Sequence, residues 1–119
     1  MKKFIALAIF ACAAATPVSA QSIGGHYKVV GTNINGTTYD GEATITLTSE
    51  TTCDIEWATG PTTSKGICMR NDDSFAAGYQ IGNDVGLVIY KVGANGVLSG
   101  LWTIAGNGGA GTETLTPIQ

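Results

Sequence analysis

The stretch from Cys53 to Cys68, CDIEWATGPTTSKGIC, constrains the fold of this chain more than any other part of the sequence. A Gly-Pro pair lies near its centre, as is typical of a turn between two strands. Folding the stretch about that centre gives one antiparallel register in which several unrelated features agree. Cysteine faces cysteine, opposite charges face each other, and a large side chain faces a glycine. The register pairs Thr52 with Met69, Cys53 with Cys68, Ile55 with Gly66, Glu56 with Lys65, and Trp57 with Ser64.

This hairpin predicts a disulfide between Cys53 and Cys68. Directly opposed residues of an antiparallel pair bring their Cβ atoms within about 4.5–5.5 Å, and strand twist closes the remaining gap between the sulfur atoms. A disulfide that closes a loop of this size stabilises a fold by about 3 kcal/mol. The connection between the strands is expected to be the four-residue loop Thr59-Gly60-Pro61-Thr62.

Residues 1–20 have the layout of a secretory signal peptide. A basic start precedes an apolar run over residues 4–15, and Val18-Ser19-Ala20 forms a small-residue cleavage site. The run is shorter than the roughly 20 residues that a membrane anchor needs. Acylation at Cys12, as in a lipoprotein, is disfavoured because a bulky Phe10 precedes it. The sequence predicts an exported chain, periplasmic or secreted to the cell surface, with a signal peptide over 1–20 and one domain over 21–119.

The charge balance argues against nucleic acid as a partner. After residue 20, four positively charged side chains stand against nine negatively charged ones, a net charge of −5. Such a domain has no basic patch that would neutralise phosphates. It also has no Lys- and Arg-rich amphipathic helix for a membrane surface and no membrane span.

The sequence predicts no metal site, no cofactor and no enzymatic activity. After residue 20 the chain has two cysteines and one histidine, His26, which are too few ligands for a zinc site. The segment Asn71-Asp72-Asp73 lacks the spacing of a calcium-binding loop. The glycine-rich segment 106–111 precedes a strand, whereas a phosphate-binding loop needs a following helix. No Ser/His/Asp arrangement is recognisable.

Alternation of apolar and polar residues recurs along the whole domain, interrupted by turn residues. Short connections make consecutive strands antiparallel neighbours, which predicts an eight-stranded up-and-down barrel, with a β-sandwich as the alternative. Glycines inside the expected strands, including Gly41, Gly66, Gly78, Gly86 and Gly100, favour the barrel because they permit curvature and leave interior room. The expected strands are 26–32, 39–48, the two strands of the Cys53–Cys68 hairpin, 74–80, 85–92, 97–104 and 111–116.

The hairpin over 85–104 fixes a second register. A three-residue loop, Ala94-Asn95-Gly96, with its glycine in the left-handed conformation places large apolar residues on one face. That register pairs Val92 with Leu98, Tyr90 with Gly100, and Val88 with Trp102. The predicted interior consists of Tyr27, Val29, Ala43, Ile45, Ile55, Trp57, Val88, Tyr90, Leu98, Trp102, Ile104 and Leu115.

Glu113 is the one acidic residue expected to face inward, because it shares a strand face with Leu115. Two roles are open to it. It is either a glutamate at the rim, bonded to backbone N–H groups or solvent, or a carboxylate inside the barrel mouth that binds a ligand or acts as an acid. In the second case Trp57, Tyr90 and Trp102 would lie near the same mouth.

Several apolar side chains are expected to point outward from neighbouring strands. They are either scattered surface residues, which are common, or an interface. Self-association is the simplest form of the interface hypothesis. The residues are Ile67, Met69, Leu87, Ile89 and Leu101.

A set of strand motifs runs through the domain. They are Tyr27-Lys28-Val29-Val30-Gly31-Thr32-Asn33, Tyr39-Asp40-Gly41, Gly66-Ile67-Cys68, Val88-Ile89-Tyr90, Leu98-Ser99-Gly100-Leu101-Trp102-Thr103 and Gly111-Thr112-Glu113-Thr114-Leu115. In these motifs the chain resembles short exported alphaproteobacterial proteins that are commonly labelled fibronectin-binding proteins. The resemblance covers nearly all of residues 21–119 and implies export, a small β domain and binding in preference to catalysis.

Three functional hypotheses follow. The first is an exported, non-enzymatic protein that binds an extracellular macromolecule such as fibronectin through its outer surface. The second is a small-ligand carrier of lipocalin-like or avidin-like architecture, with the ligand inside the barrel. The third is a periplasmic inhibitor or accessory protein that acts on an enzyme.

Overall fold

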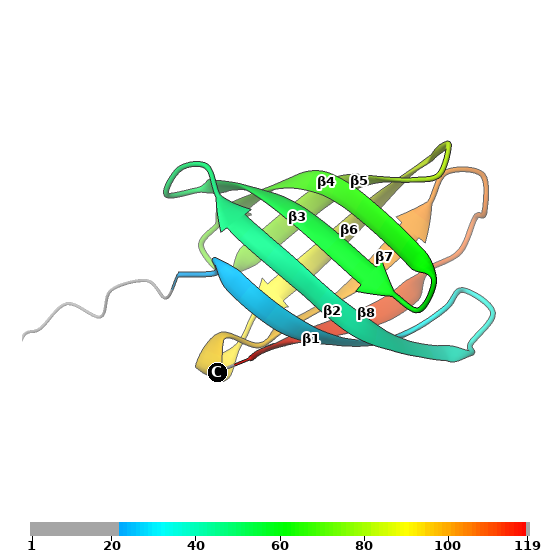
Figure 1. The fold of residues 1–119 in the computed structure, drawn as a ribbon, viewed down its shortest axis with the longest axis horizontal. Helices are drawn as coiled ribbons and strands as arrows, with labels where there is room; N and C mark the ends of the chain where they lie inside the picture. Colours follow the sequence, from blue (N-terminus) through cyan, green and yellow to red (C-terminus); the bar gives the residue numbers. More distant parts are fainter. Residues whose placement is uncertain (1–21, 119) are drawn as a thin grey trace, which may run out of the picture.

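The chain forms a closed barrel of eight antiparallel strands in a computed structural model, which describes residues 22–118 (Figure 1). Each strand pairs with the next in sequence, and the last pairs with the first. The prediction of an up-and-down barrel is therefore confirmed, and the sandwich alternative is wrong. The elements are β1 (Gly25–Thr32), β2 (Thr38–Leu47), β3 (Thr52–Thr59), β4 (Thr62–Asn71), β5 (Ser74–Ile81), β6 (Asp84–Val92), the 3-10 turn η1 (Ala94–Gly96), β7 (Leu98–Ile104) and β8 (Gly111–Pro117).

The signal peptide expected over 1–20, with Cys12, lies outside the described residues. Within residues 22–118, no helix is long and apolar enough to cross a membrane.

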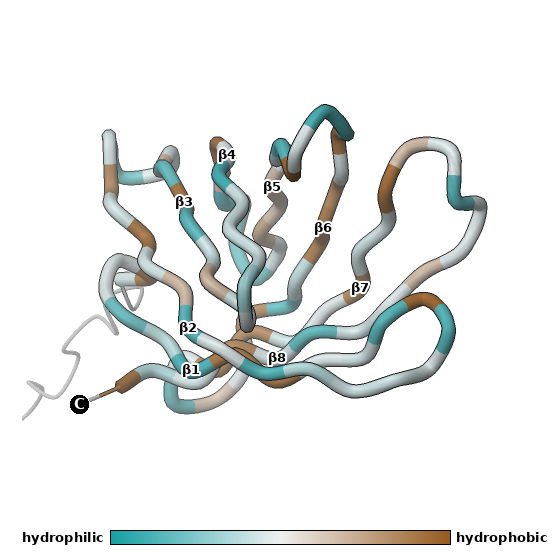
Figure 2. The backbone as a smooth tube through the Cα atoms, turned by 45° about the vertical axis from the view of Figure 1, so that its right-hand side comes forward, coloured by the Kyte–Doolittle hydropathy of each residue, from teal (hydrophilic) through white to brown (hydrophobic). Residues whose placement is uncertain are grey.

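Apolar and polar residues alternate along the strands (Figure 2). The inward-facing apolar residues are buried. The predicted interior is buried except for Trp102 and Ile104, which are half-buried because they lie beside an open end of the barrel. The sequence analysis missed further core residues, chiefly on β5, where a Phe, an Ala and a Tyr alternate. The additional buried residues are Ile23, Cys53, Cys68, Phe75, Ala77 and Tyr79.

The β3–β4 hairpin has the predicted register at every pair. The expected four-residue loop is wrong, because Thr59 pairs with Thr62 and only Gly60 and Pro61 remain in the turn. Gly60 adopts a positive φ of 63°, which a glycine tolerates without strain.

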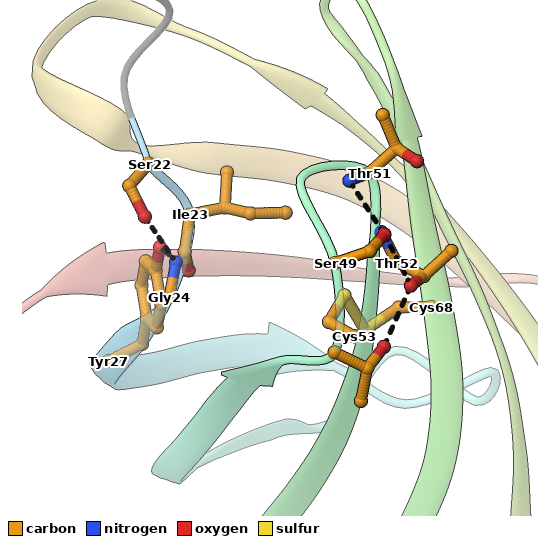
Figure 3. The surroundings of a disulfide bond; sticks show 10 residues. Ser22, Ile23, Gly24, Tyr27, Ser49, Thr51, Thr52, Cys53 and Cys68 are labelled. Carbon is orange, nitrogen blue, oxygen red and sulfur yellow. Dashed lines mark hydrogen bonds between the residues drawn. A yellow bond between two sulfur atoms is a disulfide. The ribbon is translucent and has the colours of Figure 1, made fainter.

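The predicted disulfide between Cys53 and Cys68 is present and buried at one end of the barrel (Figure 3). The N-terminal segment lies at the same end, where the Tyr27 hydroxyl donates a hydrogen bond of 2.6 Å to the Ile23 carbonyl. The ring of Phe75 stacks on that of Tyr90, with centroids 5.5 Å apart. This end is thus closed by packed side chains, and we call it the closed end.

The β6–β7 hairpin also has the predicted register. Gly96 adopts a positive φ of 75°, as the three-residue loop requires. Leu98 and Tyr90 consequently face inward and are buried, while Ile89 and Leu101 form an exposed pair on the outside.

Glycines make room for the large rings inside the barrel. A Cβ atom added to Gly86 would lie 2.2 Å from the Tyr79 ring, and one added to Gly111 would lie 2.5 Å from the Trp102 ring. Gly78 is different, because it pairs with outward-facing residues and has open space beside it. The ring–glycine pairs across neighbouring strands are Tyr39 with Gly31, Tyr79 with Gly86, Tyr90 with Gly100, and Trp102 with Gly111.

We expect Gly100→Ala to destabilise the barrel by about 1–3 kcal/mol, in the range for overpacked sites. The added Cβ would lie 2.0 Å from the Ile89 carbonyl oxygen, so the backbone must shift. Gly78→Ala is the matched control, because its nearest neighbour would be 3.8 Å away. Its free energy of unfolding should stay within about 0.5 kcal/mol of the parent protein. Urea unfolding measures both, and an equal loss in the two variants would contradict the packing argument.

Candidate functional site

A pocket of about 290 Å³ opens at the barrel end opposite the disulfide, on the right in Figure 1. Asn33 after β1, and Thr59 and Thr62 on either side of the β3–β4 turn, lie at its mouth. Four aromatic rings and one carboxylate surround the interior. They belong to Tyr39, Trp57, Tyr79, Trp102 and Glu113.

Glu113 lies inside the barrel and is only 7% exposed. Its Oε1 accepts a hydrogen bond of 2.7 Å from the Tyr39 hydroxyl. Its Oε2 accepts one of 2.8 Å from Trp57 Nε1 and another from the Tyr90 hydroxyl. The rim interpretation of Glu113 is therefore wrong, because three interior side chains surround the carboxylate in place of backbone or solvent.

Barrel closure brings these four residues together from β2, β3, β6 and β8. Leu115 packs in the core with 0% exposure, and the two-residue period of β8 turns Glu113 to the same face. Trp57 and Tyr90 face inward by the same alternation on their own strands. The site therefore depends on strand order and register, and no local sequence motif encodes it.

The other aromatic residues of the pocket have their polar atoms engaged at the barrel wall. The Tyr79 hydroxyl donates to the Thr103 carbonyl at 3.0 Å, and Trp102 Nε1 donates to the Thr112 carbonyl at 3.2 Å. Edge contacts join neighbouring rings, with centroids 5.2 Å apart for Trp57 and Tyr79. The walls of the pocket are consequently apolar ring surfaces.

Of the described residues that line the pocket, Glu113 is the one that carries a charge, and none is Lys, Arg or His. Burial, together with the charge of this carboxylate, raises the pKa of Tyr79 from 10.0 to about 12. The same causes, with a hydrogen bond to Glu113, raise the pKa of Tyr39 and of Tyr90. The three hydroxyls therefore stay protonated at neutral pH, so Tyr39 and Tyr90 donate to Glu113.

Metal ligation has no support in the part of the chain that the structure describes. Residues 22–118 contain no group of three or more His, Cys, Asp or Glu side chains that could hold an ion.

The structure joins three of the four residues predicted at the barrel mouth. Trp57, Tyr90 and Glu113 are directly hydrogen-bonded, and Trp102 forms part of the pocket wall. Tyr39 and Tyr79 were missed. Both lie opposite a glycine, as Tyr90 does, and that pairing could have identified them.

The outward apolar residues form one continuous face over β4–β7, which we call the outer apolar face. Ile67 and Met69 of β4 lie on one side of the small residues Ala76 and Gly78 of β5, and β6 supplies the other side. A shallow hollow of about 760 Å³ lies over this strip. All five predicted interface residues are more than half exposed: Ile67, Met69, Leu87, Ile89 and Leu101.

No family model and no curated protein matches the sequence. Several solved structures that are similar to this barrel are designed proteins. A redesigned β-barrel superimposes with a TM-score of 0.72 at 19% identity, covering 82% of this chain and 92% of that one. The redesigned barrel mFAP1, bound to DFHBI, gives 0.70 at 23% identity, with 79% and 94% covered. A de novo fluorescence-activating barrel gives 0.67 at 13%, with 83% and 96% covered. The shared feature is the barrel fold.

The raised tyrosine pKa values predict that the protein loses stability in alkali. Between about pH 10 and about pH 12, Tyr79 is protonated in the folded chain and increasingly ionised in the unfolded chain. The folded state then binds more protons, so the free energy of unfolding falls as pH rises and is fully retained below about pH 10. Urea midpoints at about pH 8 and about pH 11 measure the loss.

Tyr79→Phe is the control for that pH dependence, because it removes one of the hydroxyls and leaves the lysines unchanged. Its urea midpoint should fall less between the two pH values than that of the parent protein. An equal fall in both proteins would show that Tyr79 does not cause the loss.

Proposed function

We propose that this protein binds a small organic molecule in the open end of its barrel and does not transform it. The observation that carries the proposal is the buried Glu113, held by Tyr39, Trp57 and Tyr90 at a pocket of about 290 Å³. Ligand sites in proteins are typically apolar hollows with a small number of fixed polar groups. This pocket has that composition, and its volume suits a ligand at the small end of the usual range.

The arrangement of the carboxylate supports binding over catalysis. Acid–base catalysis usually relies on groups whose pKa lies near the working pH, and the described residues that line the pocket add no second carboxylate and no His, Lys or Cys to Glu113. A carboxylate that is held by hydrogen bonds is well suited to orient a ligand. Residues on rigid strands also hold a binding geometry better than residues on loops.

Export is part of the same proposal. A buried disulfide is characteristic of proteins that fold in an oxidising compartment, and Cys53 and Cys68 form one. The bond lies at the closed end, away from the pocket, so it supports the barrel without entering the ligand site.

A screen of small organic molecules, with DFHBI included because the similar designed barrel mFAP1 binds it, tests the ligand site. We expect saturable quenching or enhancement of tryptophan fluorescence, because Trp57 and Trp102 line the pocket. Ser64→Leu should weaken binding by about tenfold or more, since Ser64 lines the pocket and the larger side chain fills it.

Thr63→Leu is the matched control for that screen, because the neighbouring Thr63 is exposed on the outside of β4. Its ligand affinity should equal that of the parent protein. Saturable binding that both variants retain, or an absence of saturable binding to the parent protein, would rule out the pocket as the site.

The outer apolar face supports a second candidate function, association with a macromolecule. We propose a second copy of this chain as the occupant. The strip of Ala76 and Gly78 is a groove beside the ridge of Leu87 and Ile89, so a twofold contact can place each ridge in the partner's groove. Lys65 and Lys91 are exposed charges at the two ends of the face, which leaves its centre uncharged.

We expect sedimentation velocity to show a dimer that Leu87→Asp converts to a monomer. Val30→Asp is the matched control, because Val30 is exposed on β1, outside the face. If the parent protein stays monomeric at about 100 μM, the self-association hypothesis is ruled out, because even a weak dimer would be partly populated at that concentration. Saturable binding to immobilised fibronectin that Leu87→Asp abolishes would instead assign the face to the partner implied by the family resemblance.

A further inference from the structure

Glu113 presents a buried negative charge to a pocket that contains no positive one. Within residues 22–118, no Lys, Arg or His lines the pocket. In the described part of the chain, Lys28, Lys65 and Lys91 pair with carboxylates on the outer surface. Arg70 donates to the Asp72 carbonyl beside the β4–β5 turn, at the closed end. A buried charge is costly unless an opposite charge or several hydrogen bonds accompany it.

The three donors satisfy Glu113 only in part. An ionised carboxylate has about four acceptor positions, and Oε2 uses two of them for Trp57 and Tyr90. Among the residues that the structure describes, Oε1 accepts from Tyr39 alone. Tyr39, the donor to Oε1, and Trp57, a donor to Oε2, both line the pocket together with Glu113. The unused acceptor position is therefore on Oε1, in a carboxylate that itself lines the pocket.

The pocket walls also favour a positive charge. The rings of Tyr39, Trp57 and Trp102 line the pocket together with Glu113, and aromatic faces attract cations through their quadrupole. Tryptophan is the strongest of these cation-binding rings. A neutral ligand would leave the carboxylate without an opposite charge, and an anion would be repelled by it.

We propose that the ligand of this pocket is an organic ammonium ion, whose charged nitrogen lies against Glu113 Oε1 and between the aromatic rings. The inference rests on the proposed small-molecule function and specifies its ligand class. A pocket of about 290 Å³ has room for a substituted ammonium group with a short apolar body. Selectivity arises because the one charge in the site and its aromatic walls both favour cations.

Two matched ligand pairs test the charge requirement. Protonated dimethylethanolamine, which can donate an N–H to Oε1, has an uncharged carbon isostere in 3-methylbutanol, and protonated benzyldimethylamine has one in isobutylbenzene. Titration calorimetry and tryptophan fluorescence on the domain over residues 21–119 give the affinity for each ligand. We expect each cation to bind at least about tenfold more tightly than its isostere.

Glu113→Gln removes the charge and keeps the shape, so the preference for cations should shrink to about threefold, the part that the aromatic rings contribute. Glu42→Gln is the matched control, because Glu42 is an exposed carboxylate on the outside of β2, and it should retain the full preference. Circular dichroism checks that both variants fold. The comparison of cation and isostere on the parent protein holds even where Glu113→Gln does not fold.

The outcomes separate this inference from the proposed function. Equal binding of a cation and its isostere, or a full preference that Glu113→Gln retains, overturns the ammonium inference and leaves the small-molecule function standing. Absence of binding by both cations at about 10 mM also overturns it, because that concentration would reveal even very weak affinity. The screen with Ser64→Leu then decides separately whether the pocket binds other molecules.

Discussion

The pairing of large rings with glycines is the constraint on which this barrel and its pocket depend. An eight-stranded barrel has an interior just wide enough for side chains to fill or for one small ligand. Rings such as Tyr79 and Trp102 fit inside because the residue opposite each has no side chain. At the closed end, Phe75 and the disulfide are buried in the core. At the other end the rings stand against the walls, and the space between them is the pocket.

Much of the barrel could be predicted because its information is local. The Cys53–Cys68 stretch contains a covalent bond, an ion pair and a ring–small residue pair that agree on one register. The β6–β7 hairpin is similarly determined by one loop with Gly96 at a positive φ. In both cases the residues that must meet lie within about twenty positions of each other, where turn geometry alone fixes the pairing. The turn at Gly60-Pro61 was mispredicted because the pairing continues one residue further toward the tip than the sequence indicates.

The candidate site could be predicted only in part, because its contacts span most of the chain. The alternation of residues along β8 was enough to predict that Glu113 faces inward. It could not distinguish a rim position from an interior one, because the donors come from strands 23 to 74 residues away in sequence. Which side chains meet across a barrel depends on how neighbouring strands are staggered around the whole circumference. Tyr39 was missed for this reason, although its pairing with Gly31 follows the same rule as that of Tyr90 with Gly100.

Glu113 connects the folding of the barrel to the small-molecule binding that we propose. Its hydrogen bonds join β8 to β2, β3 and β6, so the carboxylate fixes strands that are not all neighbours in the sheet. A hydrophobic side chain of similar size would avoid the cost of desolvating a charge, and such replacements are often neutral or stabilising in protein interiors. The charge is therefore poorly explained by stability alone. A ligand that completes its coordination would bind the folded chain and not the unfolded one, and would add to stability by mass action. A carboxylate at this position is consistent with a site that is completed only when its ligand is present.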